Sequence, residues 1–432
     1  MTDAVTDPLA NPGAFLRRLF DRAVAMADPM EMLAAHLPPR PTGRVVVVGA
    51  GKASARMAEA VEATWGRCDG LIITRYGHAR PCRGIEIVEA AHPVPDQAGA
   101  QATLRMLDLL ATLGADDVVL ALMSGGASAL LCAPVAGVTL ADKQAVNAAL
   151  LASGAPIGQM NTVRKHLSRV KGGQLAAAAW PARTLALMIS DVPGDDPAMI
   201  GSGPTVGEAS TPADAQAILD RWDIAVPDSV ARALREGSGV VAPDDPRLSR
   251  TENRVIAAPA QSLAAAADLA RKAGCRVEIL GDAVEGEARD VAAAQARLAL
   301  DRQAALGPGD PPLVILSGGE LTVTRRGTGT GGPNAEFCLA LALALNGAPG
   351  IHALACDTDG VDGAAEVAGA LIDPGTLDRA TRPLARQALD ANDAHTLFGR
   401  IHASVVTGPT LTNVNDFRAI LVHKLQFSTA PR

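Results

Sequence analysis

The chain has 432 residues, of which 48% are hydrophobic and 20% charged, a balance typical of a soluble globular protein. This length exceeds what one hydrophobic core usually organises, so we expect two domains. The net charge of −7 argues against the broad basic surface with which proteins bind nucleic acids or anionic membranes. Local positive charges would have to attract any anionic substrate.

Cysteine usage and the lack of long apolar runs predict a cytoplasmic protein. The six cysteines are scattered, without a CxxC pair or zinc-like spacing, as expected of free thiols in a reducing compartment. The N-terminal residues lack the apolar core of a signal peptide. The apolar run Cys338–Leu345 falls far short of the roughly 18 residues that a membrane span needs. We therefore expect neither membrane nor nucleic acid among the partners.

Strand-like runs alternate with alanine-rich helical stretches through the first half of the chain. Helices are expected from about Ser54 and over Gln97–Leu113. The expected strands are Arg44–Gly49, Leu71–Thr74, Ile85–Ala90, Asp117–Met123 and Leu185–Asp191. Short β-branched strands separated by helices predict βαβ units and a mostly parallel sheet with helices on both faces.

The segment Arg235–Arg250, rich in Gly, Pro and Asp, is the expected linker. We place the boundary near residue 245, which gives domains of residues 1–245 and 246–432. The later strands are expected at Asn253–Ala258, Arg276–Gly281, Pro312–Gly319, His352–Asp357, Ala403–Gly408 and Ala419–Val422. The alternation in Leu321–Gly327, directly after Gly-Gly, predicts a β-hairpin. The fold class is therefore α/β, with a hairpin in the second domain.

The loop Gly49–Ser54 follows the first expected strand. Its glycines and Lys52 are typical of an anion site, where backbone N–H groups at a helix start and one point charge bind phosphate. It is not a Walker A loop, because Val46 replaces the first glycine, and Ser54 replaces the third glycine of a dinucleotide fingerprint. Arg75, at the end of the next strand, keeps an NADP-binding interpretation open. A tight turn with a solvated lysine is the alternative.

A second loop, Met123–Leu131, contains Ser124, Gly125, Gly126 and Ser128 directly after a strand. Hydroxyls and backbone donors at a helix start suit phosphate or carboxylate oxygens. Serine and glycine are also common in helix caps, which is the alternative.

Positive charge is concentrated in Asn161–Ala176, which contains Arg164, Lys165, Arg169 and Lys171. Arg164 and Lys171 are seven residues apart and would share one face of a helix. Such a run is often a solvated face. The Gly-Gly that follows Lys171 favours contact with an anion.

Carboxylates follow strands in both halves. Ile189–Thr205 combines Asp191 with an Asp-Asp pair and a Gly-Ser-Gly turn, and the run that begins at Asp357 continues with Asp359 and Asp362. Magnesium is usually held by one or two carboxylates together with substrate phosphates. Many polar, glycine-rich loops at strand ends in both halves indicate a polyanionic ligand, best explained by a nucleotide and a small acid. Turn-rich loops without a ligand are the alternative.

Taken together, the loops resemble the class II glycerate kinase family, whose second half is the MOFRL domain. The resemblance covers about residues 14 to 425. The runs that carry it are VVVVGAGKAS, AAHPVPDQAG, LMSGGASALL, MNTVRKHLSRVKGGQLA, ISDVPGDDPAMIGSGPT, LSGGELTV, GGPNAEF, DTDGVDGAAEVAGALID and TGPTLTNVND. It implies a Rossmann-like first domain, an α/β MOFRL-type second domain and an active site in the interdomain cleft.

The resemblance also implies phosphorylation of D-glycerate by ATP with Mg²⁺, at the 2-hydroxyl in this class. Lys52 matches the family's active-site lysine, and His92 falls on another of its motifs. With the residue patterns it predicts Lys52 and Asp191 as catalytic and Asp191, Asp359 and Asp362 as metal ligands. The predicted substrate and phosphate contacts are Ser124, Gly125, Gly126, Ser128, Arg164, Lys171, Glu320, Asn334 and Asn413.

One departure from the family concerns Pro333, which stands in GGPNAEF where the family often has Arg. Arg325 or Arg326 are the candidates to compensate for the missing Arg. Two other functions stay open: an NAD(P)H-dependent hydroxypyruvate reductase, a name that some relatives carry, and a non-catalytic sensor of nucleotides or sugar acids. The sequence also leaves open whether the chain forms a homodimer.

Overall fold

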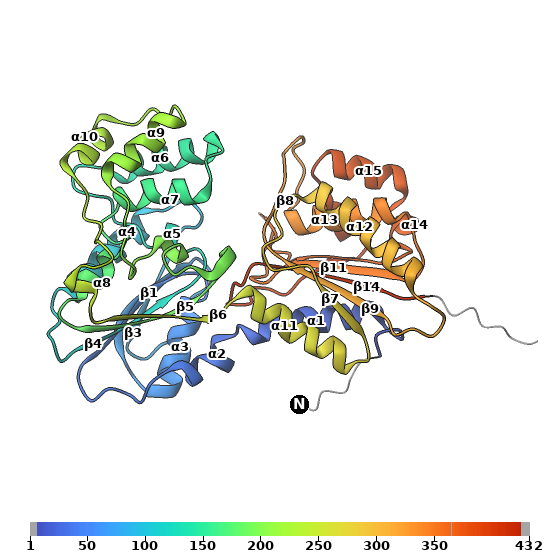
Figure 1. Ribbon diagram of the computed structural model, residues 1–432, viewed down its shortest axis with the longest axis horizontal. Helices are drawn as coiled ribbons and strands as arrows, with labels where there is room; N and C mark the ends of the chain where they lie inside the picture. Colours follow the sequence, from blue (N-terminus) through green and yellow to red (C-terminus); the bar gives the residue numbers. More distant parts are fainter. Residues whose placement is uncertain (1–6, 364, 425–432) are drawn as a thin grey trace, which may run out of the picture. The chain divides into compact units, whose positions relative to one another are not determined.

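The computed structural model describes residues 7–363 and 365–424 and divides the chain into two compact units (Figure 1). One unit spans Asp28–Ala257, and the other combines the segment up to Ala27 with the chain from Ala258 onward. The division therefore lies later than the predicted residue 245. The reason is that β6 (Thr251–Ala257) pairs with β5 (Arg183–Ile189) in the first sheet. At the other end, α1 (Pro12–Met26) packs with α11 (Pro259–Lys272) of the second unit.

The unit Asp28–Ala257 contains a six-stranded sheet in the order β3-β2-β1-β4-β5-β6. All of its strand pairings are parallel. Besides β5 and β6, its strands are β1 (Val45–Ala50), β2 (Asp69–Arg75), β3 (Ile85–Ala90) and β4 (Val118–Met123). This strand order is that of the doubly wound Rossmann fold. The predicted fold of the first domain is thereby confirmed.

Helices cover both faces of this sheet. The helix α3 (Ser54–Trp65) packs on one face, and α4 (Gln97–Leu110), α5 (Ala127–Leu130) and α8 (Gln174–Ala179) pack on the other (Figure 1). Every residue of β1 is buried, which explains why its sequence is a continuous apolar run instead of an alternating one.

A separate helical layer extends from the sheet and has an apolar core of its own, which includes Val146, Leu150 and Val163. It is built from α6 (Leu140–Ser153), α7 (Ile157–His166), α9 (Pro212–Arg221) and α10 (Asp228–Glu236). The short connection between α6 and α7 makes them an antiparallel pair. Shorter elements of this unit are α2 (Pro29–Met32), η1 (Leu33–His36), η2 (Pro193–Asp195), η3 (Ile200–Ser202) and η4 (Pro246–Leu248).

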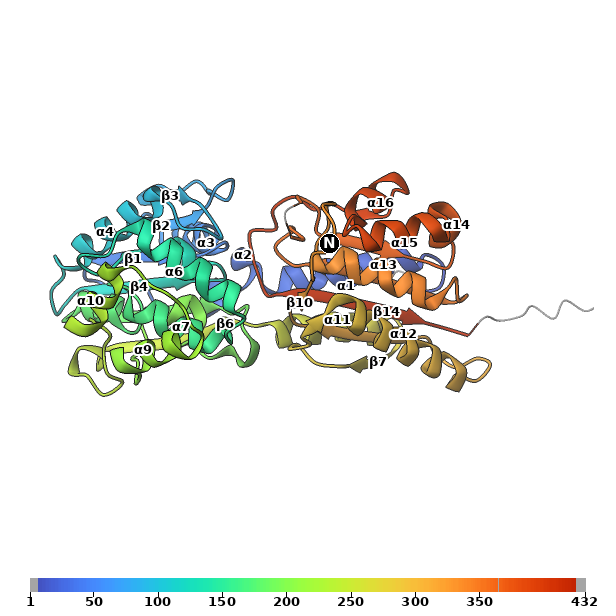
Figure 2. The ribbon, with the colours of Figure 1, turned by 90° about the horizontal axis from the view of Figure 1, so that it is seen from above.

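The second unit contains a six-stranded sheet in the order β13-β12-β11-β14-β9-β7. Only β7 and β9 are parallel among its described pairings. The strands are β7 (Arg276–Ile279), β9 (Leu313–Gly318), β11 (Ile351–Asp357), β12 (Gly369–Ile372), β13 (Ser404–Val405) and β14 (Asp416–Val422). The helices α1 and α11 pack on one face. The opposite face carries α12 (Ala288–Ala305), α13 (Pro333–Leu345), α14 (Thr376–Ala380), α15 (Arg382–Asp390) and α16 (Ala394–Arg400) (Figure 2).

The second unit contains a hairpin, as predicted, but not at the expected place, Leu321–Gly327. Instead, β10 (Leu321–Thr322) pairs in parallel with β8 (Gly286–Glu287). The Gly-Gly turn leads the chain away from β9, because the backbone of Gly319 closely approaches Val284 in the segment before β8. Antiparallel pairing of consecutive strands occurs between β11 and β12.

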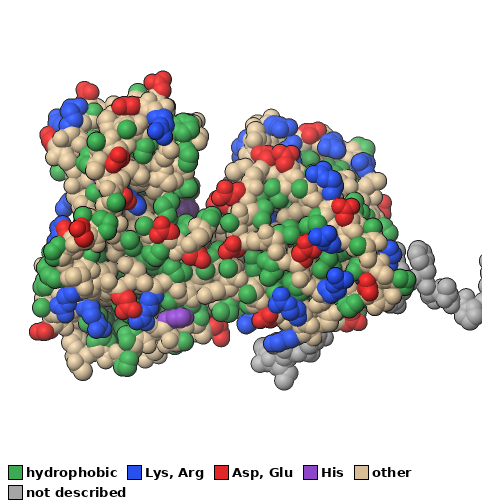
Figure 3. All heavy atoms as spheres, in the orientation of Figure 1, with side chains coloured by type: hydrophobic (Ala, Val, Ile, Leu, Met, Phe, Trp, Pro, Cys, Tyr) green, Lys and Arg blue, Asp and Glu red, His purple; other side chains and the backbone are tan. Residues whose placement is uncertain are grey.

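The remaining expectations concern thiols, membranes and surface charge. All six cysteines are free, as predicted, and five are buried. Across the described ranges, none of the helices combines the length and apolar character that crossing a bilayer requires. In the view of Figure 3, Lys and Arg side chains lie interspersed with Asp and Glu.

Candidate active site

The loops after β1 and β4 meet where the strand order of the first sheet reverses, the usual place for a ligand in open α/β folds. The backbone N–H of Lys52 donates to the Gly125 carbonyl at 2.8 Å. The N–H of Ala53 donates to the Ser124 hydroxyl at 3.0 Å. These hydrogen bonds join two loops that are far apart in the sequence, with Ala53 and Ser124 separated by 71 residues.

Two glycines allow this close approach. Gly51 has a φ of 142°, and a Cβ built on it would overlap the Ser124 hydroxyl. Gly126 has a φ of 84°, and a Cβ there would lie 3.1 Å from the His92 ring and 3.3 Å from Cγ of Lys52. The side chains of Lys52 and His92 therefore both lie against Gly126. The structure brings together three residues that sequence analysis placed on separate motifs.

Ser124 and Gly125 hold the loops in place. Ser124 is fully buried, and its hydroxyl lies 3.1 Å from that of Ser54. The carbonyl of Gly125 accepts the Lys52 N–H. The Ser124 hydroxyl thus bridges the two loops, and its predicted contact with a ligand stays a prediction.

A pocket of about 280 Å³ lies next to Gly126, within the unit Asp28–Ala257. His92, Gly126 and Ser128 line it from the loops of the sheet, and α6 and α7 line it from the helical layer. Three basic side chains, Lys143, Arg164 and Lys171, belong to the lining. Among the described residues that line it, none is Asp or Glu. A basic pocket without an acidic side chain is suited to an anion.

Arg164 is bound by amides and not by a carboxylate. Its Nε donates to Oδ1 of Asn147 at 2.8 Å, and an Nη donates to Oδ1 of Asn161 at 3.2 Å. Desolvation lowers the pKa of Arg164, since no carboxylate offsets the cost of burying the charge. The side chain of Lys165, next in the sequence, differs: its Nζ lies 2.5 Å from a Glu208 carboxylate oxygen. Of these two neighbouring cations in the predicted basic run, Lys165 is paired with a carboxylate and Arg164 is hydrogen-bonded to amide oxygens.

Lys171 lines the same pocket but does not share a helix with Arg164, because α7 ends at His166. The prediction that Arg164 and Lys171 share one face of a helix is wrong, because only Arg164 lies on α7. The Lys171 Nζ donates to the carbonyls of Ser128 at 2.9 Å, Leu131 at 3.2 Å and Gly201 at 3.4 Å. Burial, together with the positive charge of the neighbouring Lys143, lowers its pKa to about 7. Lys171 therefore lines the pocket while its hydrogen bonds hold three loops.

Sequence analysis missed Lys143. This lysine is buried, its Nζ donates to the Leu167 carbonyl at 3.0 Å, and burial lowers its pKa. The signal that could have revealed it is its place on the apolar face of α6, three and seven residues before Val146 and Leu150. A charged residue on the buried face of a helix is rare and needs a role.

The acidic loop after β5 contains two partly buried carboxylates. Asp191 follows the strand almost directly. Asp195 has a φ of 54°, and its Oδ1 is buried without a hydrogen-bond partner in the described chain. Across residues 7–363 and 365–424, no three His, Cys, Asp or Glu side chains are grouped as they would be around a metal ion. A metal held here would need oxygens from a ligand as well.

In the second unit, the polar loops meet at one edge of the sheet, where β9 and β11 end and β14 begins. The two carboxylate oxygens of Asp362 accept the backbone N–H groups of Asn334 at 3.0 Å and Ala335 at 2.8 Å. Asp362 thus caps α13, and its predicted role as a metal ligand stays a prediction. The Nδ2 of Asn334 donates to Asp416 at 2.7 Å, so this predicted binding residue also belongs to the internal network.

Buried ion pairs complete this network. Arg418 donates to a carboxylate oxygen of Asp416 at 3.1 Å, and Arg289 donates to Glu336 at 2.6 Å. Burial raises the pKa of Asp416 to about 7, although the positive charge of Arg418 acts in the opposite direction. The acidic side chains here are compensated from within the unit.

The other predicted residues of this unit lie in the same loops. Glu320 is exposed, whereas Asp359 and Asn413 are buried. Oδ1 of Asp359 accepts the Val361 N–H at 2.8 Å, and Oδ1 of Asn413 accepts the Asn415 N–H at 3.1 Å. Their predicted ligand contacts stay predictions.

Pro333, the departure from the family pattern, is the first residue of α13, a position that suits proline. Arg325 and Arg326 are both exposed, and Arg325 donates to the Gly329 carbonyl at 3.0 Å. Whether either compensates for the missing Arg stays a prediction.

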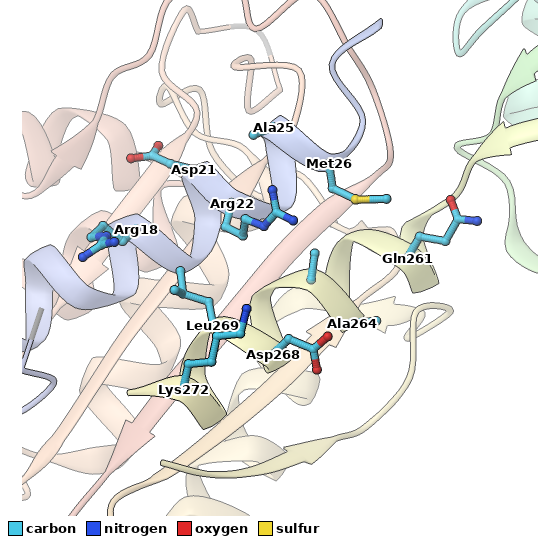
Figure 4. Close-up of a pocket in the computed structure, with 11 residues that line it drawn as sticks. Arg18, Asp21, Arg22, Ala25, Met26, Gln261, Ala264, Asp268, Leu269 and Lys272 are labelled. Carbon is cyan, nitrogen blue, oxygen red and sulfur yellow. The ribbon is translucent and has the colours of Figure 1, made fainter. Parts of the chain in front are cut away.

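A larger groove, of about 800 Å³, lies between α1 and α11 (Figure 4). Its charged side chains include Arg22 and Lys272 but also Asp21 and Asp268. None of the residues predicted to bind substrate or metal lines it. Its mixed charge makes it a weaker anion site than the pocket beside Gly126.

Comparisons with known proteins identify both halves of the chain. Residues 15–235 match a family described as a domain of unknown function, DUF4147, and residues 313–416 match the MOFRL family. A putative hydroxypyruvate reductase from Agrobacterium vitis is 52% identical over 417 residues, which cover 94% of each chain. A D-glycerate 2-kinase from Thermotoga maritima is 38% identical over 386 residues, or 88% of this chain and 91% of its own.

A solved structure is also similar. The crystal structure of a glycerate kinase from Thermotoga maritima matches with a TM-score of 0.85 at 35% identity. The match covers 95% of this chain and 99% of that one. The resemblance inferred from the loop motifs is confirmed by these matches.

Proposed function

Because the chain belongs to the glycerate kinase family, we propose that it transfers the γ-phosphate of ATP to D-glycerate. The observation that carries the proposal is the placement of Lys52 and His92 against Gly126, beside a pocket with three basic and no acidic side chains in its described lining. Phosphoryl transfer needs positioned positive charge more than covalent help from the protein. This arrangement supplies such charge in a chain whose net charge is −7.

The proposed chemistry at the reacting groups uses two residues, Lys52 and Asp191. A glycerate hydroxyl oxygen forms a bond to the γ-phosphorus, the bond from that phosphorus to the bridging oxygen breaks, and ADP leaves. Lys52 would contact the phosphoryl group during transfer and offset its charge. Asp191 would accept the hydroxyl proton as a general base. The regiochemistry that we propose is the 2-hydroxyl, as the name of the Thermotoga maritima relative suggests.

The carboxylates after β5 fit a magnesium ion that accompanies ATP. The fit rests on Oδ1 of Asp195, a buried oxygen that no described group hydrogen-bonds, in the loop that also carries Asp191. These two side chains would hold the ion, since magnesium uses few protein carboxylates when phosphates complete its coordination. The ion would neutralise phosphate charge. Asp359 stays a second candidate from the sequence.

The reductase name of the Agrobacterium vitis relative defines the alternative function. A reductase of the Rossmann type would bind a dinucleotide at the loop after β1. Ser54 occupies the third-glycine position there, and its hydroxyl donates to the Leu122 carbonyl at 3.0 Å. The dinucleotide fingerprint is therefore incomplete, whereas the chain matches glycerate kinases over most of its length. We favour the kinase for these reasons.

Two assays on the same preparation test the proposal. One supplies D-glycerate, ATP and Mg²⁺ and follows ADP, and the other supplies hydroxypyruvate with NADH or NADPH and follows cofactor oxidation. We expect ADP formation that depends on glycerate, and ³¹P NMR should identify 2-phosphoglycerate as the product. Oxidation of NAD(P)H without ADP formation would overturn the proposal, and 3-phosphoglycerate would correct only the regiochemistry.

A further inference from the structure

The pocket beside Gly126 has two chemically different ends. Lys143, Val146, Asn147, Leu150 and Leu151 line it from α6 at spacings of one, three and four residues, which places them on one face of that helix. The charged end begins at Lys143, and the other end reaches Leu151. These two positions are separated by about 12 Å along the helix, at about 1.5 Å per residue.

The antiparallel helix α7 also lines the pocket with charged groups at one end and an apolar side chain at the other. The Lys143 Nζ bonds to the carbonyl of Leu167, just after α7, and Asn147 bonds to Arg164 in its last turn. Ile157, the first residue of α7, lines the pocket as Leu151 does. The cations of both helices therefore lie at one end of the pocket, and apolar side chains lie at the other.

The apolar end is open to solvent. Leu151 is 58% exposed and Ile157 is 55% exposed, whereas Leu150 between them and the charged end is buried. Large exposed apolar side chains that rim a cavity are typical of a surface that a ligand covers. The charged end adjoins His92 and Gly126, against which Lys52 packs.

We propose that this pocket is the nucleotide subsite, with the base between Leu150, Leu151 and Ile157 and the phosphates toward Arg164 and Lys143. This inference rests on the proposed kinase function. D-glycerate has two carbon–carbon bonds of about 1.5 Å and no apolar group, so it would span only the charged end. A nucleoside triphosphate joins a flat, weakly polar base to a polyanion and matches both ends. Its terminal phosphate then points toward Lys52.

The glycine-rich loop before α13 is the competing phosphate site, and its electrostatics disfavour it. A helix start attracts anions through its free N–H groups. At α13 the first of these groups are already bound to the carboxylate of Asp362, and Glu336 lies in the first turn. A triphosphate there would meet negative charge where the pocket in the first unit offers positive charge.

The test uses the double variant Leu151→Ala/Ile157→Ala, whose side chains are too exposed to support much of the core. The matched control is Leu104→Ala, a leucine of α4 that is 38% exposed and does not line the pocket. We expect the KM for ATP to rise about tenfold, equivalent to about 1.4 kcal/mol. The KM for D-glycerate should stay within about twofold, and the control should change neither value.

A binding measurement separates this inference from the kinase proposal. Titration calorimetry with the non-hydrolysable analogue AMP-PNP and Mg²⁺ needs no turnover, and the double variant should bind about tenfold more weakly than the unaltered chain. Weaker AMP-PNP binding in a chain that phosphorylates no glycerate would support the subsite and refute the kinase function. Unchanged AMP-PNP affinity, or a rise in the glycerate KM alone, would overturn the subsite.

Discussion

The loops after β1 and β4 and the polar loops of the second unit are both rich in glycine and polar residues. They differ in whether their buried charged side chains are paired with opposite charges. Beside β1 and β4, Lys143 and Arg164 bind only carbonyl and amide oxygens, and the described lining of their pocket has no acidic side chain. In the second unit, Asp416 is paired with Arg418 and Asp362 caps α13. Buried charges that remain uncompensated are costly and indicate a ligand, whereas compensated ones contribute to the fold. The comparison teaches that glycine-rich loops alone do not identify the phosphate site.

The comparison predicts that breaking a pair in the second unit costs stability. Arg418→Met leaves the carboxylate of Asp416 buried and unpaired, so we expect a loss of about 3–5 kcal/mol in the free energy of unfolding. Urea denaturation followed by circular dichroism measures it. The double variant Asp416→Asn/Arg418→Met should recover part of this loss. Full stability in Arg418→Met would show that the pair is not structural.

In the first unit, removing the lysine at the strand reversal should cost activity and not stability. For Lys52→Ala we expect kcat to fall about 10²–10³-fold, the usual effect of losing one group that stabilises a developing charge. The urea midpoint should not move. Lys272→Ala, which removes an exposed lysine on α11, is the control and should keep its activity. An active Lys52→Ala would remove the catalytic role of this residue.

Neighbouring basic residues of α7 provide a sharper contrast. Arg164→Met removes a cation without stranding a carboxylate, so we expect the KM for ATP to rise about 10–100-fold, from the loss of about 1.5–3 kcal/mol of charge-assisted contact. Its unfolding free energy should be unchanged or higher. Lys165→Met strands Glu208 and should lower stability while leaving the KM for ATP near its original value. The reverse pattern would mean that the pocket does not bind an anion.

The smallest expected effect is the uptake of protons when the nucleotide binds. The pKa of Lys171 is lowered to about 7, so at about pH 8 only about a tenth of these side chains carry charge. A bound anion favours the ammonium form and raises this pKa, so nucleotide binding should take up protons, at most one per chain. Calorimetric titrations in buffers of different ionisation enthalpy measure the uptake. Lys171→Met should reduce it, with Lys143 supplying what remains, and proton release in the unaltered chain would contradict the assignment.

Local patterns were enough to predict the first sheet. The continuous apolar runs at β1 and β4 predicted a parallel sheet, and the glycines after them predicted that ligands bind at the carboxyl ends of its strands. The linker chemistry of Arg235–Arg250 was misleading, because the chain returns to the same sheet as β6 after it. A segment rich in turn residues can be a surface loop within a domain as well as a linker between two domains.

Contacts between distant segments were beyond sequence reasoning. The run around Asp359 and Asp362 has the composition of a metal loop, but Asp362 also accepts the N–H of Asn334, 28 residues earlier, in the first turn of α13. Lys143 stands between Asp142 and Gln144, polar neighbours typical of a solvated helix. Its burial becomes evident only once α7 packs against α6.

A crystal structure with AMP-PNP, Mg²⁺ and D-glycerate would test most directly that the uncompensated cations, and not the glycine-rich loop before α13, receive the phosphates. We predict the base against Leu151 and Ile157 and the phosphates among Arg164, Lys143 and Lys52. Phosphates bound over Gly327–Gly332, with the pocket beside Gly126 filled by glycerate or by water, would contradict it.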